Sequence, residues 1–393
     1  MTPLTFYREY VSKNKPVIIE GAISHWPALT KWQSDEYLAQ VAGEEKVTID
    51  FTPDGRGDSI VDDRLFVTPV EEEMRFKDFL PLLDHAPDAS PNEAHGYIET
   101  GRNPPGVPYC QHQNSSFTEQ FKALHSDAGL DIPLATEALG AKPHSANFWM
   151  GSGHSISTMH QDHDENLYAV ICGEKIFTLV PPAEEYWLTR RSCPRARWVR
   201  SPQPPEGTVE EGVVDRTACD NSDCVFVLDD EEANAADEAN ADVVNRPFIR
   251  ALPTPAENAA HMVRKGPFVT ELVPGAPAVP WIDMDVDAHP MQYTPGTRRA
   301  QLARALAHIN KFTVSVKAGQ VLYLPAMWFH TVQQRGRTIA VNFWYDMQYD
   351  VRFLQLEFMR RVGAAKNEAF QRELAATQEE YTVSEEVRNG DTD

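Results

Sequence analysis

Hydrophobic positions alternate with polar ones along a series of short segments, which is the period-two pattern of β-strands. The series begins near residue 145, stops near residue 180 and resumes after residue 310. Its segments are ANFWMG, SISTMHQDH, NLYAVICG, EKIFTLVPP, FTVSVKAG, QVLYLPAMWFHTVQQ and RTIAVNFWYD. Because strand follows strand at short spacing, the pattern predicts a mainly β fold, an antiparallel sandwich or barrel, and argues against a βαβ fold.

The first part of the chain mixes helical and extended patterns. Thr2 and Pro3 are suited to be the N-cap and first residue of a helix. The apolar residues that follow at helical spacing are Leu4, Tyr7 and Val11. Further elements are expected in this order: a strand over 16–21, a helix over 35–41, a strand over 46–55, a helix over 74–83, an extended segment over 108–113 and a helix over 117–130.

Composition shifts divide the chain into three parts. Between residues 181 and 280 lie 13 of the 29 prolines, together with the acidic run DDEEANAADEANAD. We therefore predict a barrel domain over 108–350, after an N-terminal region over 1–107, with an acidic, Pro-rich and partly disordered insertion over about 190–267. A helix with Leu302, Leu306 and Ile309 on one face follows the insertion. Residues 351–376 are helical by period and lead into a polar tail to residue 393.

The charge of the chain limits its partners. The formal net charge is -22 and the isoelectric point is near 5.0, so the average surface repels nucleic acids and anionic membranes and attracts basic proteins. The start has no cationic segment followed by an apolar run, and no stretch of 18 apolar residues occurs, so we expect a cytoplasmic protein, with the nucleus as a second compartment. Five scattered cysteines predict free thiols.

His160 and Asp162 lie two residues apart in a segment that alternates like a strand, so both side chains project from one face. With a second imidazole from another strand they would form the two-His-one-carboxylate set that leaves open positions on Fe(II). The same spacing recurs at His125 and Asp127, but there the pattern is helical and polar, and residues two apart on a helix do not face one another. Only His160 and Asp162 are therefore candidate metal ligands. The alternative is that the imidazole is hydrogen-bonded within the protein or exposed to solvent.

Two further residues strengthen that candidate. Lys175 lies fifteen residues after His160 among alternating apolar residues, where burial requires a fixed anion such as a bound dicarboxylate. The alternative is a lysine that reaches water from the strand edge. His330 lies among aromatic and aliphatic neighbours and offers the second imidazole. The alternative for His330 is a core histidine bonded to a backbone carbonyl.

At this point the sequence resembles the Jumonji-C family of Fe(II)- and 2-oxoglutarate-dependent oxygenases, and most closely its lysyl 3-hydroxylase type. The matching strings extend from Lys15 to Asp350. They are KPVIIEGAISHWPAL, FTPDG, ANFWMG, MHQDHDENLYAVICGEK, VPWI, GQVLYLPAMWFHTVQQ and TIAVNFWYD. The resemblance implies a double-stranded β-helix, the jelly-roll or cupin-like barrel, with N-terminal α/β elements and C-terminal helices.

The resemblance also implies roles for individual residues. His160, Asp162 and His330 would bind Fe(II), and Lys175 would pair with the distal carboxylate of 2-oxoglutarate, assisted by the hydroxyl of Tyr109. Three more positions match residues that lie near the cosubstrate or the metal; these are Ser157, Asn166 and Asn342. For each asparagine the alternative is a buried amide satisfied by backbone groups. The insertion, and His163 and Asp164 beside the ligands, depart from the family pattern.

The activity implied by the resemblance is hydroxylation of a lysine at carbon 3 in a partner protein, with Fe(II), 2-oxoglutarate and O2 consumed as cofactor and cosubstrates. The implied partner is a developmentally regulated GTPase with an exposed lysine. Carboxylates beside the motifs that could hold the lysine amine are Asp164, Glu165 and Asp346, and the alternative for each is a solvated loop carboxylate. The alternatives are a Jumonji-C demethylase, a peptidase acting on methylated tails, and an inactive binding scaffold. The C-terminal helix would pack on its own barrel or join two subunits in a homodimer.

Overall fold

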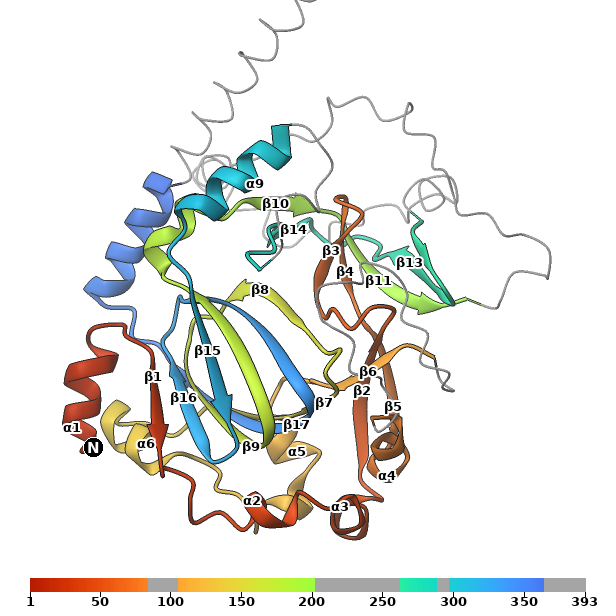
Figure 1. Ribbon diagram of the computed structural model, residues 1–393, viewed down its shortest axis with the longest axis vertical. Helices are drawn as coiled ribbons and strands as arrows, with labels where there is room; N and C mark the ends of the chain where they lie inside the picture. Colours follow the sequence, from red (N-terminus) through yellow and green to blue (C-terminus); the bar gives the residue numbers. More distant parts are fainter. Residues whose placement is uncertain (84–104, 202–261, 288–296, 364–393) are drawn as a thin grey trace, which may run out of the picture.

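The computed structural model describes residues 1–83, 105–201, 262–287 and 297–363 and shows a curled β-barrel with helices and two small sheets around it (Figure 1). The strands are β1 Val17–Glu20, β2 Lys46–Thr52, β3 Ser59–Val61, β4 Leu65–Thr68, β5 Val70–Arg75, β6 Val107–Cys110, β7 Ser145–Gly151, β8 Ser157–Gln161, β9 Asp164–Val180, β10 Arg190–Cys193, β11 Arg195–Arg200, β12 Arg264–Lys265, β13 Phe268–Leu272, β14 Val279–Ile282, β15 Phe312–Lys317, β16 Gln320–Leu324 and β17 Phe329–Asp346. The α-helices are α1 Pro3–Phe6, α2 Ala28–Lys31, α3 Asp35–Ala42, α4 Phe76–Phe79, α5 Ser116–Glu119, α6 Pro133–Leu139 and α9 Thr297–His308, and residues 351–363 are also helical.

One large antiparallel sheet makes the barrel. Its strands lie in the order β1-β16-β9-β17-β7-β6-β2-β5, with β15 also paired to β9 and β8 also paired to β17. The long strands β9 and β17 pair along their whole length, from Phe329 opposite Val180 to Asp346 opposite Asp164. The prediction of a mainly β, jelly-roll barrel is confirmed.

Each long strand turns a corner at a glycine. The sequence pattern separates NLYAVICG from EKIFTLVPP, but the structure joins them into β9, with Gly173 at φ +74° where the strand bends. β17 bends in the same way near Gly336, at φ +62°, and its register with β9 shifts between Arg335 and Ile339. A Cβ at Gly173 would lie 2.4 Å from the carbonyl oxygen of Arg337. Glycine therefore allows the two corners to pack against each other.

The N-terminal helix begins as predicted, with the Thr2 hydroxyl accepting a hydrogen bond from the amide of Thr5. Of the three predicted apolar residues, Val11 is buried and Tyr7 packs against the core, whereas Leu4 is exposed and Phe6 is buried in its place. A π-helical turn over Tyr7–Val11 follows α1, and the wider turn brings residues five apart onto one face. The prediction from the α-helical period is therefore confirmed for Tyr7 and Val11 and wrong for Leu4.

Two other predicted helices are divided into short pieces. Over 74–83, Met74 belongs to strand β5, helix α4 begins at Phe76, and a 3₁₀ turn over Leu80–Leu82 follows it directly. Over 117–130, α5 Ser116–Glu119 and a 3₁₀ turn over Lys122–Leu124 replace the single helix. The short polar segments between these elements fold against the barrel through individual side-chain contacts, which a helical period does not encode.

The segments that flank residues 202–261 form regular structure. β11 pairs with β13 and, in parallel, with β4, within a sheet ordered β12-β13-β11-β4-β3, and β10 pairs with β14. Residues 190–200 and 264–265, which the sequence places in the insertion, are therefore strands. The acidic run and the chain beyond residue 363 lie outside the described residues. Cys110, Cys172 and Cys193 are buried free thiols, as predicted.

Candidate metal centre

Three predicted metal ligands converge at the mouth of the barrel. His160 of β8 and His330 of β17 are directly opposite one another in the sheet, and their rings lie 4.1 Å apart. The Asp162 carboxylate follows β8 and lies 3.6 Å from Nε2 of His330 and 4.0 Å from Nε2 of His160. One atom from each side chain can therefore reach a common point. We call these residues the ligand triad.

The imidazoles are oriented by the backbone. Nδ1 of His160 lies 2.6 Å from the carbonyl oxygen of Thr158, and Nδ1 of His330 lies 3.1 Å from that of Trp328. A donated proton at Nδ1 leaves the Nε2 lone pair for a metal. Burial, and then the neighbouring His160, lower the pKa of His330 to about 4, so its ring is neutral at pH 7. Two imidazoles with one carboxylate fit the donor set of a non-haem Fe(II) site.

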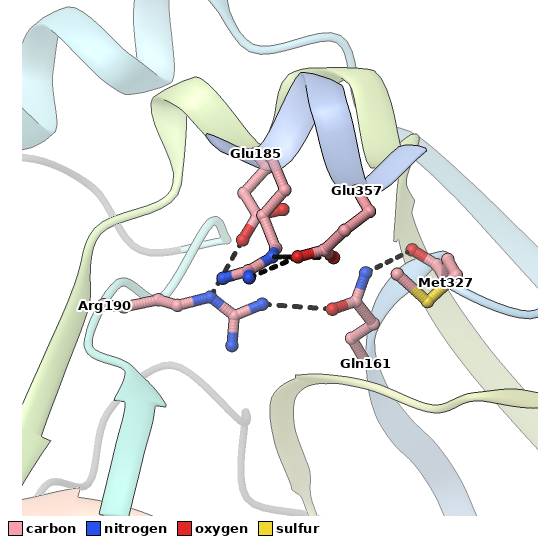
Figure 2. Close-up of polar contacts among 6 residues, drawn as sticks. Gln161, Glu185, Arg190, Met327 and Glu357 are labelled. Atoms are coloured by element: carbon pink, nitrogen blue, oxygen red, sulfur yellow. Dashed lines mark hydrogen bonds and ion pairs between the residues drawn. The ribbon is translucent and has the colours of Figure 1, made fainter. Parts of the chain in front are cut away.

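A second set of bonds holds the turn that carries Asp162 (Figure 2). Gln161 donates to the carbonyl oxygen of Met327 at 2.7 Å and accepts from Arg190 at 3.1 Å. Arg190 also donates to Glu185 at 3.0 Å. In return the Met327 amide donates to the carbonyl oxygen of Asp162 at 2.8 Å. The backbone between the first two ligands is therefore fixed to the turn that precedes the third.

Lys175 is buried inside the barrel with an exposed fraction of 1%. Its Nζ donates to the hydroxyl of Tyr109 at 2.8 Å, and no carboxylate pairs with it in the described parts of the chain. Burial lowers the pKa of Lys175 to about 7. The alternative of a lysine reaching water is therefore wrong, and the site suits an incoming anion that restores the charge.

The remaining predicted cosubstrate residues also face this interior. The hydroxyl of Ser157 is hydrogen-bonded to that of Tyr109, whose pKa is raised by burial. Asn342 accepts from the indole of Trp149 at 2.8 Å and donates to the side-chain oxygen of Asn166 at 3.2 Å. The two amides thus bond to each other and to a tryptophan, which differs from the alternative of amides satisfied by the backbone.

Two polar residues beside Lys175 escaped the sequence analysis. Gln334 lies opposite Lys175 in the pairing of β17 with β9. Gln334 and Ser155 both pack closely against Gly151, where an added Cβ would lie 2.4 Å from Nε2 of Gln334 and 2.7 Å from Oγ of Ser155. Within the described residues, Oε1 of Gln334 and Oγ of Ser155 are buried without a hydrogen-bond partner. The available signal was the alternation that places Gln334 on the same face as His330.

The second His-x-Asp pair has a structural role. Asp127 is fully buried, although the pattern predicted a polar helix, and it accepts from Lys31 at 2.6 Å, Tyr37 at 2.6 Å and Trp32 at 3.2 Å. Nε2 of His125 lies 2.9 Å from the carbonyl oxygen of Phe117. The pair does not converge on one point, so setting it aside as a metal site agrees with the structure, while the reason given for doing so was wrong.

A further group of similar side chains lies at the adjoining ends of β7, β9 and β17. It consists of His144, Asp164 and Asp346, which we call the surface group. Nε2 of His144 lies 2.7 Å from Oδ1 of Asp164. Glu165, which was a candidate for holding a substrate amine, is buried and accepts from the Tyr323 hydroxyl at 2.7 Å, so that prediction is wrong.

Comparison with known proteins extends over most of the chain. A cupin-like domain matches residues 3–351. The human bifunctional peptidase and (3S)-lysyl hydroxylase JMJD7 is 32% identical over 91% of this chain and 85% of its own length. The Arabidopsis thaliana lysine-specific demethylase JMJ32 is 30% identical over 91% of this chain and 83% of its own, and the Dictyostelium discoideum JmjC domain-containing protein E is 30% identical over 91% and 86%.

No helix in the described residues is long and apolar enough to cross a membrane. The barrel, the convergent triad and the similarity over almost the whole length agree with one another. The chain belongs to the cupin-like Jumonji-C family.

Proposed function

We propose that this protein is an Fe(II)- and 2-oxoglutarate-dependent hydroxylase that adds one oxygen atom to carbon 3 of a lysine in a partner protein. The reaction consumes O2 and 2-oxoglutarate and releases succinate and CO2, so that one oxygen atom enters the lysine and the other enters succinate. The observation that carries the proposal is the ligand triad at the mouth of a barrel that also buries an unpaired lysine.

The triad would hold the ferrous ion, which, with 2-oxoglutarate and O2, supplies the oxidation of an unactivated C–H bond. The protein supplies position. Lys175 and Tyr109 present a buried ammonium and hydroxyl to the distal carboxylate of the cosubstrate, at the depth where water is excluded. The bonds from Gln161 and Met327 fix the segment that carries Asp162 and would hold its carboxylate in place as a ligand.

Lysine as the target rests on similarity to the human lysyl hydroxylase. The Arabidopsis relative is named a demethylase, so removal of an N-methyl group is the second candidate. The two reactions differ in product, because demethylation releases formaldehyde and hydroxylation leaves the oxygen on the lysine. Peptidase activity has less support, since the sequence has neither a His-Glu-x-x-His motif nor a Gly-x-Ser-x-Gly motif.

The partner and the assembly are also proposals. The partner would be a GTPase of the developmentally regulated class with an exposed lysine. Helix 351–363 packs Phe353 and Leu356 against Met327 and Met347, while Leu354 and Phe358 remain 64% and 67% exposed. This exposed face supports a homodimer through the C-terminal helices. Light scattering that gives a monomer mass for the full chain would contradict the dimer.

The deciding experiment incubates the full chain with Fe(II), 2-oxoglutarate and a recombinant developmentally regulated GTPase. Mass spectrometry should show one added oxygen atom on a lysine, together with succinate. Formaldehyde from a methylated substrate without an added oxygen would favour the demethylase. The Asp162→Ala protein is the matched control, because it keeps the fold and loses the carboxylate ligand. If succinate forms but the GTPase gains no oxygen, the proposal that this GTPase is the substrate is contradicted.

A further inference from the structure

Asp50 is a buried carboxylate that the proposed chemistry does not use. It lies on β2 directly opposite Tyr109 of β6, and opposed residues project from the same side of a sheet. Its neighbours Ile49 and Phe51 face the main hydrophobic core, whereas Tyr109 belongs to the cluster that lines the barrel interior. Asp50 therefore faces the same interior as the cosubstrate pocket.

The carboxylate of Asp50 is only half satisfied. Oδ2 accepts from the Gln111 side-chain amide at 2.8 Å. Oδ1 is buried and has no hydrogen-bond partner among the described residues, and the residue as a whole is 7% exposed. A buried carboxylate oxygen without a donor costs free energy, so its retention inside a functional barrel indicates a ligand that supplies the missing donor.

The surroundings of Asp50 are acidic. The pKa of Asp50 is raised to about 7, mainly by burial and to a lesser extent by the carboxylates of Glu71 and Asp58, against the lowering effect of the Gln111 amide. Asp58 is half-buried and Glu71 is exposed, so negative charge extends from the interior to the surface. No described lysine or arginine forms an ion pair with Asp50 or Asp58. The positive charges near Asp58 are those of Arg195 and, when it is protonated, His160, and neither forms an ion pair with it.

This acidic pocket adjoins the ligand triad. The carbonyl oxygen of Asp58 accepts a hydrogen bond from the Thr158 hydroxyl, and the carbonyl oxygen of Thr158 lies 2.6 Å from Nδ1 of His160. Trp281 donates to the same hydroxyl at 3.2 Å, and its ring lies parallel to that of His160 with centroids 6.2 Å apart. Asp58 and Trp281 thus lie beside the strand that carries His160, and Asp58 is close enough to Asp50 for the two carboxylates to interact electrostatically.

We propose that Asp50, assisted by Asp58, binds the positively charged end of the substrate side chain while the aliphatic part of that side chain passes the ligand triad. The inference rests on the proposed function, because it names the group that selects the substrate of the same site. A side chain that enters with its charge unpaired would lose solvation, and the free oxygen of Asp50 supplies the compensating partner.

The chemistry of the pocket favours an ammonium over a guanidinium. A guanidinium is planar and binds best to both oxygens of one carboxylate. In Asp50 one of the two oxygens is already bound to Gln111, which leaves a single acceptor. A compact ammonium needs only single acceptors from separate groups, which Asp50 and Asp58 provide.

The Gln111 amide that occupies Oδ2 is held by close packing. A Cβ at Gly57 would lie 3.3 Å from both atoms of that amide, and the Gly57 amide donates to the carbonyl oxygen of Ile156, next to β8, at 2.9 Å. The loop over 56–58 therefore fixes both Gln111 and Asp58 relative to the strand that bears His160.

The test compares three small probes on the full chain loaded with Mn(II) and 2-oxoglutarate without oxygen. The probes are the Nα-acetyl N-methylamides of lysine, norleucine and arginine, and their dissociation constants are measured by NMR titration. The wild type should bind the lysine probe about tenfold or more tightly than the norleucine probe. In Asp50→Asn this ratio should fall to about one, and Asp50→Glu should restore part of it.

The matched control is Asp62→Asn, the same change at an exposed carboxylate that pairs with Arg64; it should keep the wild-type ratio. An unchanged ratio in Asp50→Asn, or no preference for lysine in the wild type, would overturn the inference. Tightest binding of the arginine probe would overturn the assignment to an ammonium. Succinate release by the wild type is measured separately. If the protein prefers the lysine probe over the norleucine probe but releases no succinate, the proposed function is contradicted and the inference about Asp50 is not.

Discussion

Two groups of imidazole and carboxylate side chains lie close together at the barrel mouth. They are the ligand triad of His160, Asp162 and His330, and the surface group of His144, Asp164 and Asp346. In the triad both histidines use Nδ1 for a backbone carbonyl, which leaves Nε2 directed at the shared point. In the surface group Nε2 of the histidine is already bound to a carboxylate, and the side chain of Asp346 is 92% exposed.

The difference shows that residue type and proximity do not make a metal site. Water competes with a metal ion for an exposed carboxylate such as that of Asp346. The Nε2 atom of His144 must also break its hydrogen bond to Asp164 before it can bind a metal. Orientation by the backbone and partial burial leave the triad with unsatisfied atoms that a cation can occupy. The comparison can be tested because Asp162 and Asp164 are the same residue type, two positions apart.

The largest expected effect separates the two groups directly. Asp162→Ala should abolish measurable succinate release and weaken Mn(II) binding by more than about 100-fold, since removing a ligand costs more than disturbing the groups that orient it. Asp164→Ala should change Mn(II) affinity by less than about twofold. Calorimetric titration of both proteins with Mn(II) checks this. Similar losses in the two variants would mean that the groups share one ion.

The next effect concerns the anion pocket behind the triad. Lys175→Ala should weaken 2-oxoglutarate by roughly 3–5 kcal/mol, because the distal carboxylate loses its buried partner, while Mn(II) binding is kept. The affinity is measured by titrating Mn(II)-loaded protein with 2-oxoglutarate. Lys317→Ala, at an exposed lysine, is the control and should have no effect. Unchanged affinity in the Lys175 variant would remove this lysine from the pocket.

A smaller effect on stability tests whether burial strains the acidic pocket. The pKa of Asp50 is about 7 when folded and near 4 when unfolded, so between about pH 4 and 7 the folded state holds more protons. Stability from this group is therefore lost as pH rises through that window. Asp50→Asn should raise the free energy of unfolding by up to about 4 kcal/mol at pH 8 and by little below pH 4. Urea unfolding at both pH values provides the measurement, and a destabilised variant at pH 8 would contradict it.

The smallest effect belongs to the surface group. His144→Ala removes a partly exposed ion pair with Asp164 and should change the free energy of unfolding by less than about 1 kcal/mol, with no change in Mn(II) affinity. Thermal unfolding and the Mn(II) titration measure the two quantities. A loss of several kcal/mol would show that the pair is a structural anchor of the strand ends.

Much of the barrel and of the triad could be predicted because alternation records which residues share a face. His160 and His330 lie opposite one another in paired strands, and Asp162 follows β8 two residues after His160, so the alternation carries all three to one side. The breaks in the pattern at Gly173 and Gly336 also mark real features, but they are corners within one strand rather than ends of two. A pattern of side chains does not show whether the backbone continues through a bend.

Asp50 could not be found in this way. Thr48, Asp50 and Thr52 read as the solvent face of an ordinary strand, whereas in this barrel that phase faces a polar functional interior. Gln334 was missed for the same reason, because it is a polar residue at a position that faces the interior of the barrel. Polar residues at alternate positions indicate either water or a ligand, and only the three-dimensional structure distinguishes the two.

The corners of β9 and β17 have a consequence for the order of assembly. Because His160 and His330 meet only after both strands have bent and paired, the contacts that build the site have a high sequence separation, which slows folding. Metal therefore cannot nucleate this chain in the way it nucleates a zinc finger. We expect the apo chain to complete its topology first, so that iron loading is a late maturation step.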